Sequence, residues 1–265
     1  MVKISTFTPQ INNLNPKPLY NGVSVNIGET PEHRAARPTI VKGAKKIPIA
    51  LVGPSTHSQI YEEMVKLNIN LTDCIFIHCG HGGQDIIDYL NLASAGWTSI
   101  KSGITNAGYT LADIKWMIFG TDDLHSSSNI FPAAPQSLSA NILKFVDLAK
   151  TQMPNLKAVD LMSRINGDTI TEVRFAEPSS YYTGFAHKFA VESTFATGHL
   201  RNGVWITDAL NMWTKGETVR SDGLYIRYDW MQTNGGPHIK KLPSQGRPVL
   251  GKFAFDYCKR YPEFK

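Results

Sequence analysis

Short apolar runs divide the chain from residue 48 onward. Four of them span residues 49–52, 74–77, 116–119 and 156–161, and the first three are continuous series of apolar side chains. Short continuous runs of this kind are typical of strands that are buried on both faces of a sheet. The pattern therefore predicts four buried strands. Two shorter stretches, residues 204–206 and 224–228, predict further strands.

Segments between and after these runs carry apolar residues at helical spacing, which predicts amphipathic helices. The expected helices cover residues 57–67, 136–152, 182–196 and 244–260. Another helix is expected after the second run, on the apolar positions Ile86, Ile87, Leu90 and Leu92. Residues 94–112 show little periodicity and are expected to form a loop. Strands that alternate with helices indicate an α/β domain of parallel strands joined by helical crossovers.

Residues 1–47 differ in character from the rest of the chain. Five prolines interrupt any helix there, so an extended arm is expected in front of a domain that covers residues 48–265. The arm has seven basic and two acidic residues, whereas the rest has twenty of each, so the whole net charge of +5 lies on the arm. Such asymmetry indicates a tail that contacts an acidic partner. A neighbouring subunit, a nucleic acid, another surface and a merely solubilising role remain open alternatives.

Composition excludes several classes of protein. The chain starts without the apolar stretch of a signal peptide and contains no membrane-length apolar run, so a cytoplasmic or assembly-associated protein without membrane contact is expected. It lacks a dinucleotide fingerprint and a P-loop, and no cofactor is expected. It also lacks the basic and aromatic motif of an RNA-binding module, so nucleic acid is not the expected partner. Three cysteines give no disulfide framework, and buried free thiols are expected at Cys74 and Cys79.

Polar turns follow the first three predicted strands. They are Gly53-Pro54-Ser55, Gly80-His81-Gly82-Gly83 and Gly120-Thr121-Asp122-Asp123. The carboxyl ends of parallel strands meet at one edge of an open sheet, where ligands bind. We therefore expect these three turns to converge.

Ser55 is the candidate nucleophile in this group of turns. A serine between a buried strand and a helix can present its hydroxyl at the helix N-terminus, where N–H groups stabilise a developing oxyanion. The alternative is that Ser55 or Thr56 only caps the helix. A nucleophilic serine needs a base, and His238 in a late glycine-containing loop is the best-placed histidine.

A metal site is the less favoured explanation of another group of residues. These are Cys74, His78, Cys79 and His81, at and just after the second predicted strand. Tetrahedral zinc sites usually take paired ligands from a second element, and no matching cluster follows downstream. No metal is therefore expected.

The order of these blocks resembles the SGNH (GDSL-like) hydrolases over residues 48–260. Three further stretches look like a bacterial branch of that superfamily: residues 82–84, 161–165 and 220–224. The resemblance implies a three-layer αβα sandwich with a flavodoxin-like, doubly wound parallel sheet. It also implies hydrolysis of an ester or acetyl ester, often on a carbohydrate.

Site roles follow from the resemblance residue by residue. Ser55 would be the nucleophile, the backbone N–H of Gly83 or its neighbour Gly82 would serve the oxyanion hole, and His238 would be the general base. Asp122 stands where the family has an asparagine that donates to the oxyanion.

Two departures from the family pattern bear on activity. An ionised Asp122 carries acceptors only, so it cannot replace that donor. The acid expected three residues before His238 is Gly235, and Asp229 or Asp222 would have to act from a distance. The alternative function is therefore a catalytically degenerate domain that serves as a structural or binding module in an assembly such as a viral particle. The arm would then contact a neighbour, and a homo-oligomer would be expected.

Overall fold

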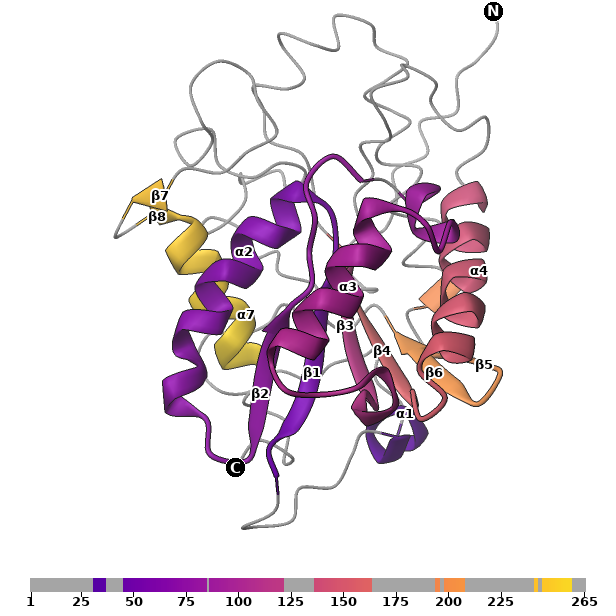
Figure 1. The fold of residues 1–265 in the computed structure, drawn as a ribbon, viewed down its shortest axis with the longest axis horizontal. Coiled ribbons are helices and arrows are strands. Elements are labelled where there is room, and N and C mark those ends of the chain that lie inside the picture. The colour runs from indigo at the N-terminus through magenta and orange to yellow at the C-terminus, as the bar shows by residue number, and fades with distance from the viewer. Residues whose placement is uncertain are drawn as a thin grey trace, which may run out of the picture.

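A computed structural model describes residues 31–36, 45–84, 86–121, 136–163, 194–195, 198–207, 241–242 and 245–258. Its central feature is a six-stranded sheet in the order β2-β1-β3-β4-β6-β5, and a two-stranded ribbon pairs β7 with β8 (Figure 1). The strands are β1 Ile47–Val52, β2 Cys74–His78, β3 Trp116–Thr121, β4 Ala158–Ser163, β5 His199–Arg201, β6 Val204–Thr207, β7 Lys241–Leu242 and β8 Gln245–Gly246. The helices are α1 Pro31–Ala36, α2 Ser55–Lys66, α3 Ala95–Asn106, α4 Gln136–Gln152 and α7 Arg247–Cys258. Short 3-10 turns cover Leu67–Asn70 (η2), Asp88–Leu90 (η3) and Leu111–Asp113 (η4).

In the six-stranded sheet, all neighbours from β2 to β6 are paired in parallel, and β5 runs antiparallel to its partner β6. The order of the parallel strands is the doubly wound, flavodoxin-like arrangement, in which the chain reverses direction across the sheet beside β1. The expected α/β class, with a three-layer sandwich, is therefore confirmed.

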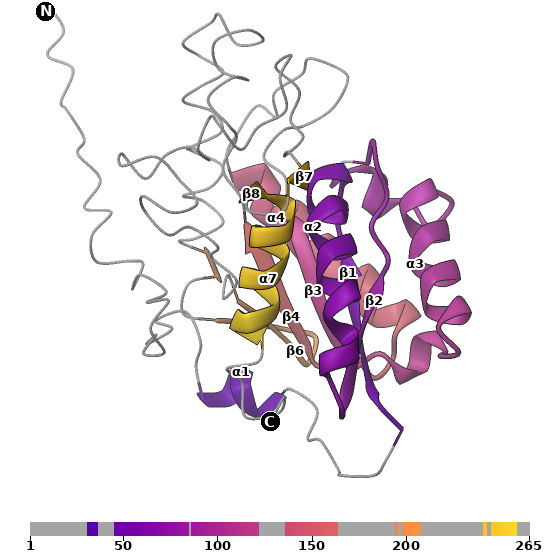
Figure 2. The same ribbon diagram turned by 90° about the vertical axis from the view of Figure 1, so that its left-hand side faces the viewer.

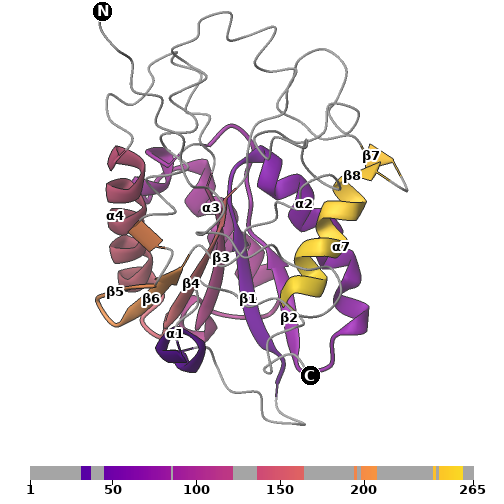
Figure 3. The same ribbon diagram turned by 180° about the vertical axis from the view of Figure 1, so that it is seen from behind.

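Successive side chains along the strands point alternately into two separate hydrophobic cores, one on each face of the sheet. Ile49 and Leu51 of β1 point toward α2 and α7, whereas Ala50 and Val52 point toward α3 and α4. Views from opposite sides show the two pairs of helices on opposite faces (Figures 1 and 3), and the view along the sheet shows α7 and α3 on either side of the strands (Figure 2). Burial on both faces explains why the strands are apolar without alternation.

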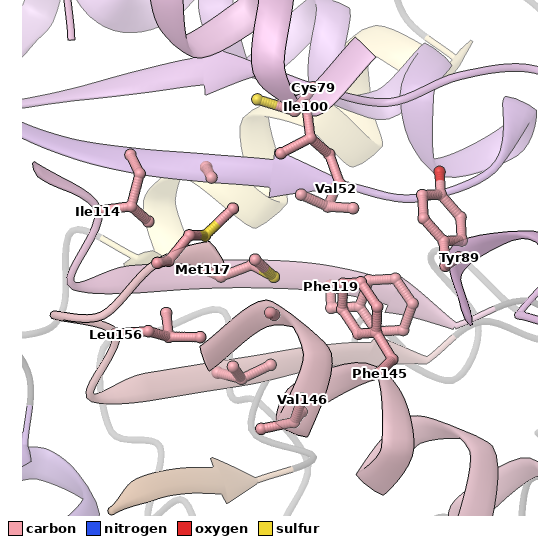
Figure 4. Packing of buried hydrophobic residues seen from close by; sticks show 14 of the residues in the cluster. Val52, Cys79, Tyr89, Ile100, Ile114, Met117, Phe119, Phe145, Val146 and Leu156 are labelled. Carbon is pink, nitrogen blue, oxygen red and sulfur yellow. The ribbon is translucent and has the colours of Figure 1, made fainter. Parts of the chain in front are cut away.

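Three aromatic side chains pack together within the core beneath α3 and α4 (Figure 4). Phe119 of β3 and Phe145 of α4 are stacked with their ring centroids 4.3 Å apart. Tyr89 of η3 meets both rings edge-on. This cluster fixes the segment after β2 against the sheet.

The first strand is anchored where it begins. Lys45 donates a hydrogen bond to the carbonyl of Gly108 (3.0 Å), and its ammonium lies 4.0 Å from the ring centroid of Tyr109. Lys46 donates to the carbonyl of Leu71 (2.9 Å), and the Tyr109 hydroxyl donates to the carbonyl of Lys46 (3.0 Å). These contacts hold the chain at the amino end of the strands, the opposite end from the start of α2.

Two predictions for the chain after β2 are wrong, one of a helix and one of a loop. Residues 86–94 form turns and η3 instead of an α-helix, because only Ile86 and Tyr89 are buried there while Ile87 is 56% exposed. The expected loop at 94–112 contains α3, which Ser94 caps by accepting a hydrogen bond from the backbone N–H of Trp97.

Three further expectations need correction. The arm is not extended throughout, because α1 begins at Pro31, and proline is tolerated at the first helical position. The fourth strand begins at Ala158 rather than at residue 156. The antiparallel β5 was not expected at all.

Other expectations hold or lie outside the described residues. All three cysteines are buried free thiols. The predicted helix at 182–196 falls outside the described residues except for 194–195, which are helical, and the predicted strand at 224–228 falls outside them entirely. Across the described part of the chain, no helix has the length and apolarity that crossing a membrane requires.

Candidate active site

Ser55 is the first residue of α2 and follows β1 after a two-residue connection. The residue that caps the helix is Pro54, in an extended conformation and without a side-chain hydrogen bond to the first turn. The carbonyl of Pro54 instead accepts the N–H of Ser58 (2.8 Å). Ser55 is half-buried and does not occupy the cap position, so the capping explanation of this serine is wrong.

The turn after β2 lies directly beside Ser55. The N–H of His81 donates to the carbonyl of Gly53 (3.0 Å), which ties this turn to the end of β1. A Cβ atom added to Gly82 would lie 3.6 Å from the Cβ of Ser55. Gly83 has φ +72°, a conformation that L side chains rarely adopt. Gly82 and Gly83 are exposed, so their backbone groups are accessible next to the serine.

Three glycines bring the strand ends close together beneath this serine. A Cβ on Gly53 would lie 3.2 Å from the Cα of Gly120, and a Cβ on Gly80 would lie 3.1 Å from the carbonyl oxygen of Gly53. The first turn of α2 fills the remaining space, with His57 against Gly120 and Ser58 against Gly80. The expected convergence of the turns after β1, β2 and β3 is confirmed for these described residues.

A second serine–histidine contact lies on the same helix but has a different character. The Ser58 hydroxyl is 2.9 Å from His78 Nε2, and the same nitrogen is 3.1 Å from the backbone carbonyl of Ser58. A carbonyl oxygen only accepts, so Nε2 carries a proton and donates it there. This nitrogen therefore cannot take a proton from Ser58, and the pair braces α2 against β2.

The residues considered for a metal site face different elements. His78 is bonded to Ser58 of α2, whereas His81 Nδ1 lies 2.9 Å from the hydroxyl of Ser99 on α3. Within the described residues, no three His, Cys, Asp or Glu side chains are grouped to hold a metal ion.

Two buried groups near the site, the Cys79 thiol and the Tyr61 hydroxyl, stay neutral at physiological pH. Burial raises the pKa of the Cys79 thiol to about 12, although the hydrogen bond to Leu51 opposes the rise. Burial also raises the pKa of Tyr61 well above its usual value, and its hydroxyl donates to the carbonyl of Val52 (3.1 Å). Neither group can act as a base near neutral pH.

The remaining predicted site residues lie outside the described residues. Asp122 falls within 122–135, and Asp229 and His238 fall within 208–240. Their roles stay predictions. Of the predicted site, the structure brings together Ser55 and the Gly82–Gly83 turn.

Comparisons with known proteins find matches among solved structures only. No family model matches the chain, and no curated protein matches it. The chain is similar to a GDSL-like lipase from Bacteroides thetaiotaomicron, with 15% identity, coverage of 86% of this chain and 93% of that chain, and a TM-score of 0.48. It is also similar to a candidate SGNH hydrolase from Slackia heliotrinireducens, with 11% identity, coverage of 82% and 99%, and a TM-score of 0.42.

A third similar structure is a carbohydrate esterase family 2 enzyme with a carbohydrate-binding domain from Corynascus thermopiles. It shares 12% identity, with coverage of 83% of this chain and 68% of that chain and a TM-score of 0.40. With identities of 11–15% and TM-scores of 0.40–0.48, these likenesses assign no role to individual residues of this chain.

Sequence reasoning missed three residues that shape the site. His57 is fully buried under Gly53 and Gly120. Gln84 Oε1 accepts the N–H of Gly96 (2.9 Å), which joins the end of the turn to the start of α3. Tyr89 lies in the segment predicted as a helix. Only the glycines at the ends of the predicted strands signalled such close packing.

Proposed function

We propose that the chain is a serine ester hydrolase with Ser55 as its nucleophile. The observation that supports this most is a half-buried serine that does not cap the helix, at the first position of α2, so close to Gly82 that a Cβ added there would lie 3.6 Å from its own Cβ. The first turn of α2 and the glycine turn thus lie side by side at this serine, and N–H groups of a helix N-terminus or of a glycine turn are the kind of donors that an oxyanion needs. The order of motifs, which resembles the SGNH hydrolases, agrees with this chemistry.

The reaction would proceed by acyl transfer through the serine. The Ser55 oxygen attacks the ester carbonyl and forms a bond to its carbon, while His238 accepts the hydroxyl proton. The alcohol leaves with that proton, and a water molecule then hydrolyses the acyl-serine with His238 again as base. The substrate class is an ester or acetyl ester, with carbohydrate esters first to be tried.

Oxyanion stabilisation in this proposal comes from backbone groups. Gly83, or its neighbour Gly82, supplies one N–H donor to the oxyanion, and the first turn of α2 supplies the other N–H donors. An ionised Asp122 cannot donate, and losing one such donor typically reduces the rate by about 10²–10³-fold. Asp229 is the proposed acid that orients His238. We therefore expect a slow hydrolase unless Asp122 is protonated.

Labelling with a fluorophosphonate probe tests the nucleophile. The probe phosphonylates an activated serine, so the wild-type chain should be labelled and Ser55→Ala should not. Ser58→Ala is the matched control, because it removes a hydroxyl three residues further along the same helix. Labelling that persists in a folded Ser55→Ala variant, or that disappears in Ser58→Ala instead, would refute the assignment.

The alternative function is a structural or binding module in an assembly. Two features of the sequence favour it: Asp122 at the oxyanion position, and the net positive charge of residues 1–47. Its test is the oligomeric state of the full chain against a variant without residues 1–30. That deletion keeps α1, which contacts β6, and the anchors at Lys45 and Lys46. An assembly that dissociates in the variant would favour this function, and an unchanged monomer would count against it.

A further inference from the structure

The turn after β2 contains two exposed glycines beside Ser55. Gly82 and Gly83 are both exposed, and Gly83 has φ +72°. A Cβ atom added to Gly83 would meet nothing within 4 Å, so no neighbour packs against it on the side where a side chain would lie. Glycine has more backbone freedom than any other residue. The direction of these two peptide groups therefore depends on the contacts that hold the turn before and after them.

The part of the turn before the two glycines is held by both helices that flank it. The N–H of His81 donates to the carbonyl of Gly53 at the end of β1 (3.0 Å). A Cβ atom on Gly80 would lie 2.8 Å from the Cβ of Ser58 on α2. On the other side, Nδ1 of His81 lies 2.9 Å from the hydroxyl of Ser99 on α3. Residues 80 and 81 thus have close neighbours on both faces of the sheet.

The side chain of Gln84 holds the part of the turn that follows the glycines. Its Oε1 accepts the N–H of Gly96, near the start of α3 (2.9 Å). Its Nε2 donates to the backbone carbonyl of Gly83 (3.4 Å). One amide group therefore joins the second exposed glycine of the turn to the backbone of a helix.

That helix is a rigid support, because its inner face is packed into the core. Trp97, Ile100 and Ile104 are all 0% exposed. The indole N–H of Trp97 donates to the backbone carbonyl of Tyr89 (2.8 Å). A Cβ atom on Gly96 would lie 2.7 Å from Cε1 of the Tyr89 ring, so the start of α3 already lies as close to that ring as it can. A side chain bonded to Gly96 is thus bonded to a closely packed part of the domain.

Capping of α3 explains only one of the two bonds that Gln84 makes. The cap of this helix is Ser94, whose side chain accepts the N–H of Trp97 (3.3 Å). Gly96 is buried, so its N–H also needs an acceptor, and Oε1 of Gln84 supplies it. The contact with Gly83 uses the amide nitrogen, which capping does not require. The two roles can therefore be separated by substitution.

We propose that Gln84 is a positioning residue for the glycine turn beside Ser55. Its amide fixes the carbonyl of Gly83 relative to α3, while the N–H of His81 fixes the start of the turn relative to β1. The N–H groups of Gly82 and Gly83 then keep one direction, as preorganised donors to an oxyanion must. The catalytic value of this restraint rests on the proposed function, whereas the restraint itself does not.

Gln84→Ala tests the restraint, and Ser94→Ala is its matched control. Each substitution removes one acceptor from the first turn of α3, so both should lower the thermal midpoint. Only Gln84→Ala should loosen the turn. From ¹⁵N relaxation we expect backbone order parameters of about 0.85 for Gly82 and Gly83 in the wild type and in Ser94→Ala, and below about 0.6 in Gln84→Ala.

Gln84→Glu separates positioning from capping. A glutamate keeps an oxygen for the N–H of Gly96, and its negative charge suits the start of a helix, so the midpoint should stay at the wild-type value or rise. It has no N–H for the carbonyl of Gly83, so both glycines should be as mobile as in Gln84→Ala. Rigid glycines in Gln84→Glu would reduce this side chain to a second cap of α3 and overturn the inference.

Fluorophosphonate labelling measures the consequence at Ser55. The maximal labelling rate should fall by about tenfold in Gln84→Ala, with the half-saturating probe concentration unchanged, because a misaligned donor weakens the transition state more than binding. Ser94→Ala should be labelled at the wild-type rate, although its midpoint is lowered as well. Mobile glycines with an unchanged labelling rate would overturn the positioning role.

The outcomes also separate this inference from the proposed function. Rigid Gly82 and Gly83 in Gln84→Ala would overturn the inference, whatever the labelling shows. An equal loss of order in Ser94→Ala would overturn it too, because any disturbance of α3 would then be sufficient. Glycines that loosen in Gln84→Ala alone, in a chain whose wild type no fluorophosphonate labels, would support the restraint and refute the proposed function.

Discussion

Gly120→Ala is predicted to destabilise the fold strongly, because the added methyl group has no space. A Cβ atom at this position would lie 2.3 Å from Cγ, 2.5 Å from Cδ2 and 2.6 Å from Cβ of His57. His57 is 0% exposed, and its own Cβ would lie 2.9 Å from a Cβ atom on Gly53. Real Cβ atoms do not approach heavy atoms this closely, so either β3 or the first turn of α2 must move.

The size of the effect follows from the lack of space for the methyl group. Overpacking a well-filled core costs about 1–3 kcal/mol, and three contacts below 3.0 Å with the fully buried His57 side chain place Gly120→Ala at about 3 kcal/mol or above. Small domains unfold with a free energy of about 5–15 kcal/mol, so this loss is a large share of the total. Gly82→Ala is the control, since its Cβ would meet only the Cβ of Ser55 at an ordinary 3.6 Å.

Urea unfolding followed by circular dichroism measures the difference. We expect Gly120→Ala to lower the free energy of unfolding by about 3 kcal/mol and Gly82→Ala to change it by less than about 1 kcal/mol. His57→Ala in the Gly120→Ala background should recover part of the loss, because two of the three close contacts are with the imidazole ring. A loss below about 1 kcal/mol for Gly120→Ala, or no coupling to His57, would refute the packing argument.

Two further predictions concern titration and thiol chemistry. Hydrogen bonds from Arg201 hold the pKa of Asp147 below its usual value, so this pair stabilises the fold above the unfolded-state pKa of about 3.9 and loses that contribution as the pH falls through the lower, folded-state pKa. Arg201→Met should therefore show a smaller drop in thermal midpoint than the wild type between about pH 6 and about pH 3; equal drops would contradict the assignment. Burial of all three thiols, with the pKa of Cys79 raised to about 12, predicts that no cysteine reacts with a thiol reagent near pH 8 until the chain unfolds. Fast labelling of the native protein would show that one of them is accessible.

The predicted strands of the central sheet were found where continuous apolar runs occur, because a strand covered on both faces carries that signal in its own residues. The prediction of a loop where α3 stands was wrong for a physical reason. Gly96 and Gly103 reduce both helix propensity and periodicity, yet each is needed where the helix touches its surroundings. A Cβ on Gly96 would meet the Tyr89 ring, and one on Gly103 would lie 2.6 Å from the carbonyl oxygen of His78. Close tertiary packing therefore hid this helix from the sequence pattern.

The unexpected β5 has a local signal in the sequence after it. Asn202 and Gly203, both with positive φ, connect β5 to β6, and an Asn-Gly pair is a strong indicator of a tight hairpin. At the site, Ser55 and the glycine turn could be predicted because strand ends reveal them. The position of Tyr89 could not be predicted, because it depends on packing against Phe119 and Phe145, which are distant in sequence.

The anchoring of β1 has a mechanical consequence. β1 is a central strand, with parallel partners on both sides from Ile47↔Cys74 to Leu51↔His78 and from Ile49↔Trp116 to Val52↔Phe119. Tension applied at residue 45 along the strand axis would load these two rows of hydrogen bonds in shear, so they would have to break together rather than one by one. The hydrogen bonds that Lys45 and Lys46 donate to the carbonyls of Gly108 and Leu71 would have to break first. A segment joined to the domain at this point is thus attached to an interior strand, whose two rows of hydrogen bonds resist extension together.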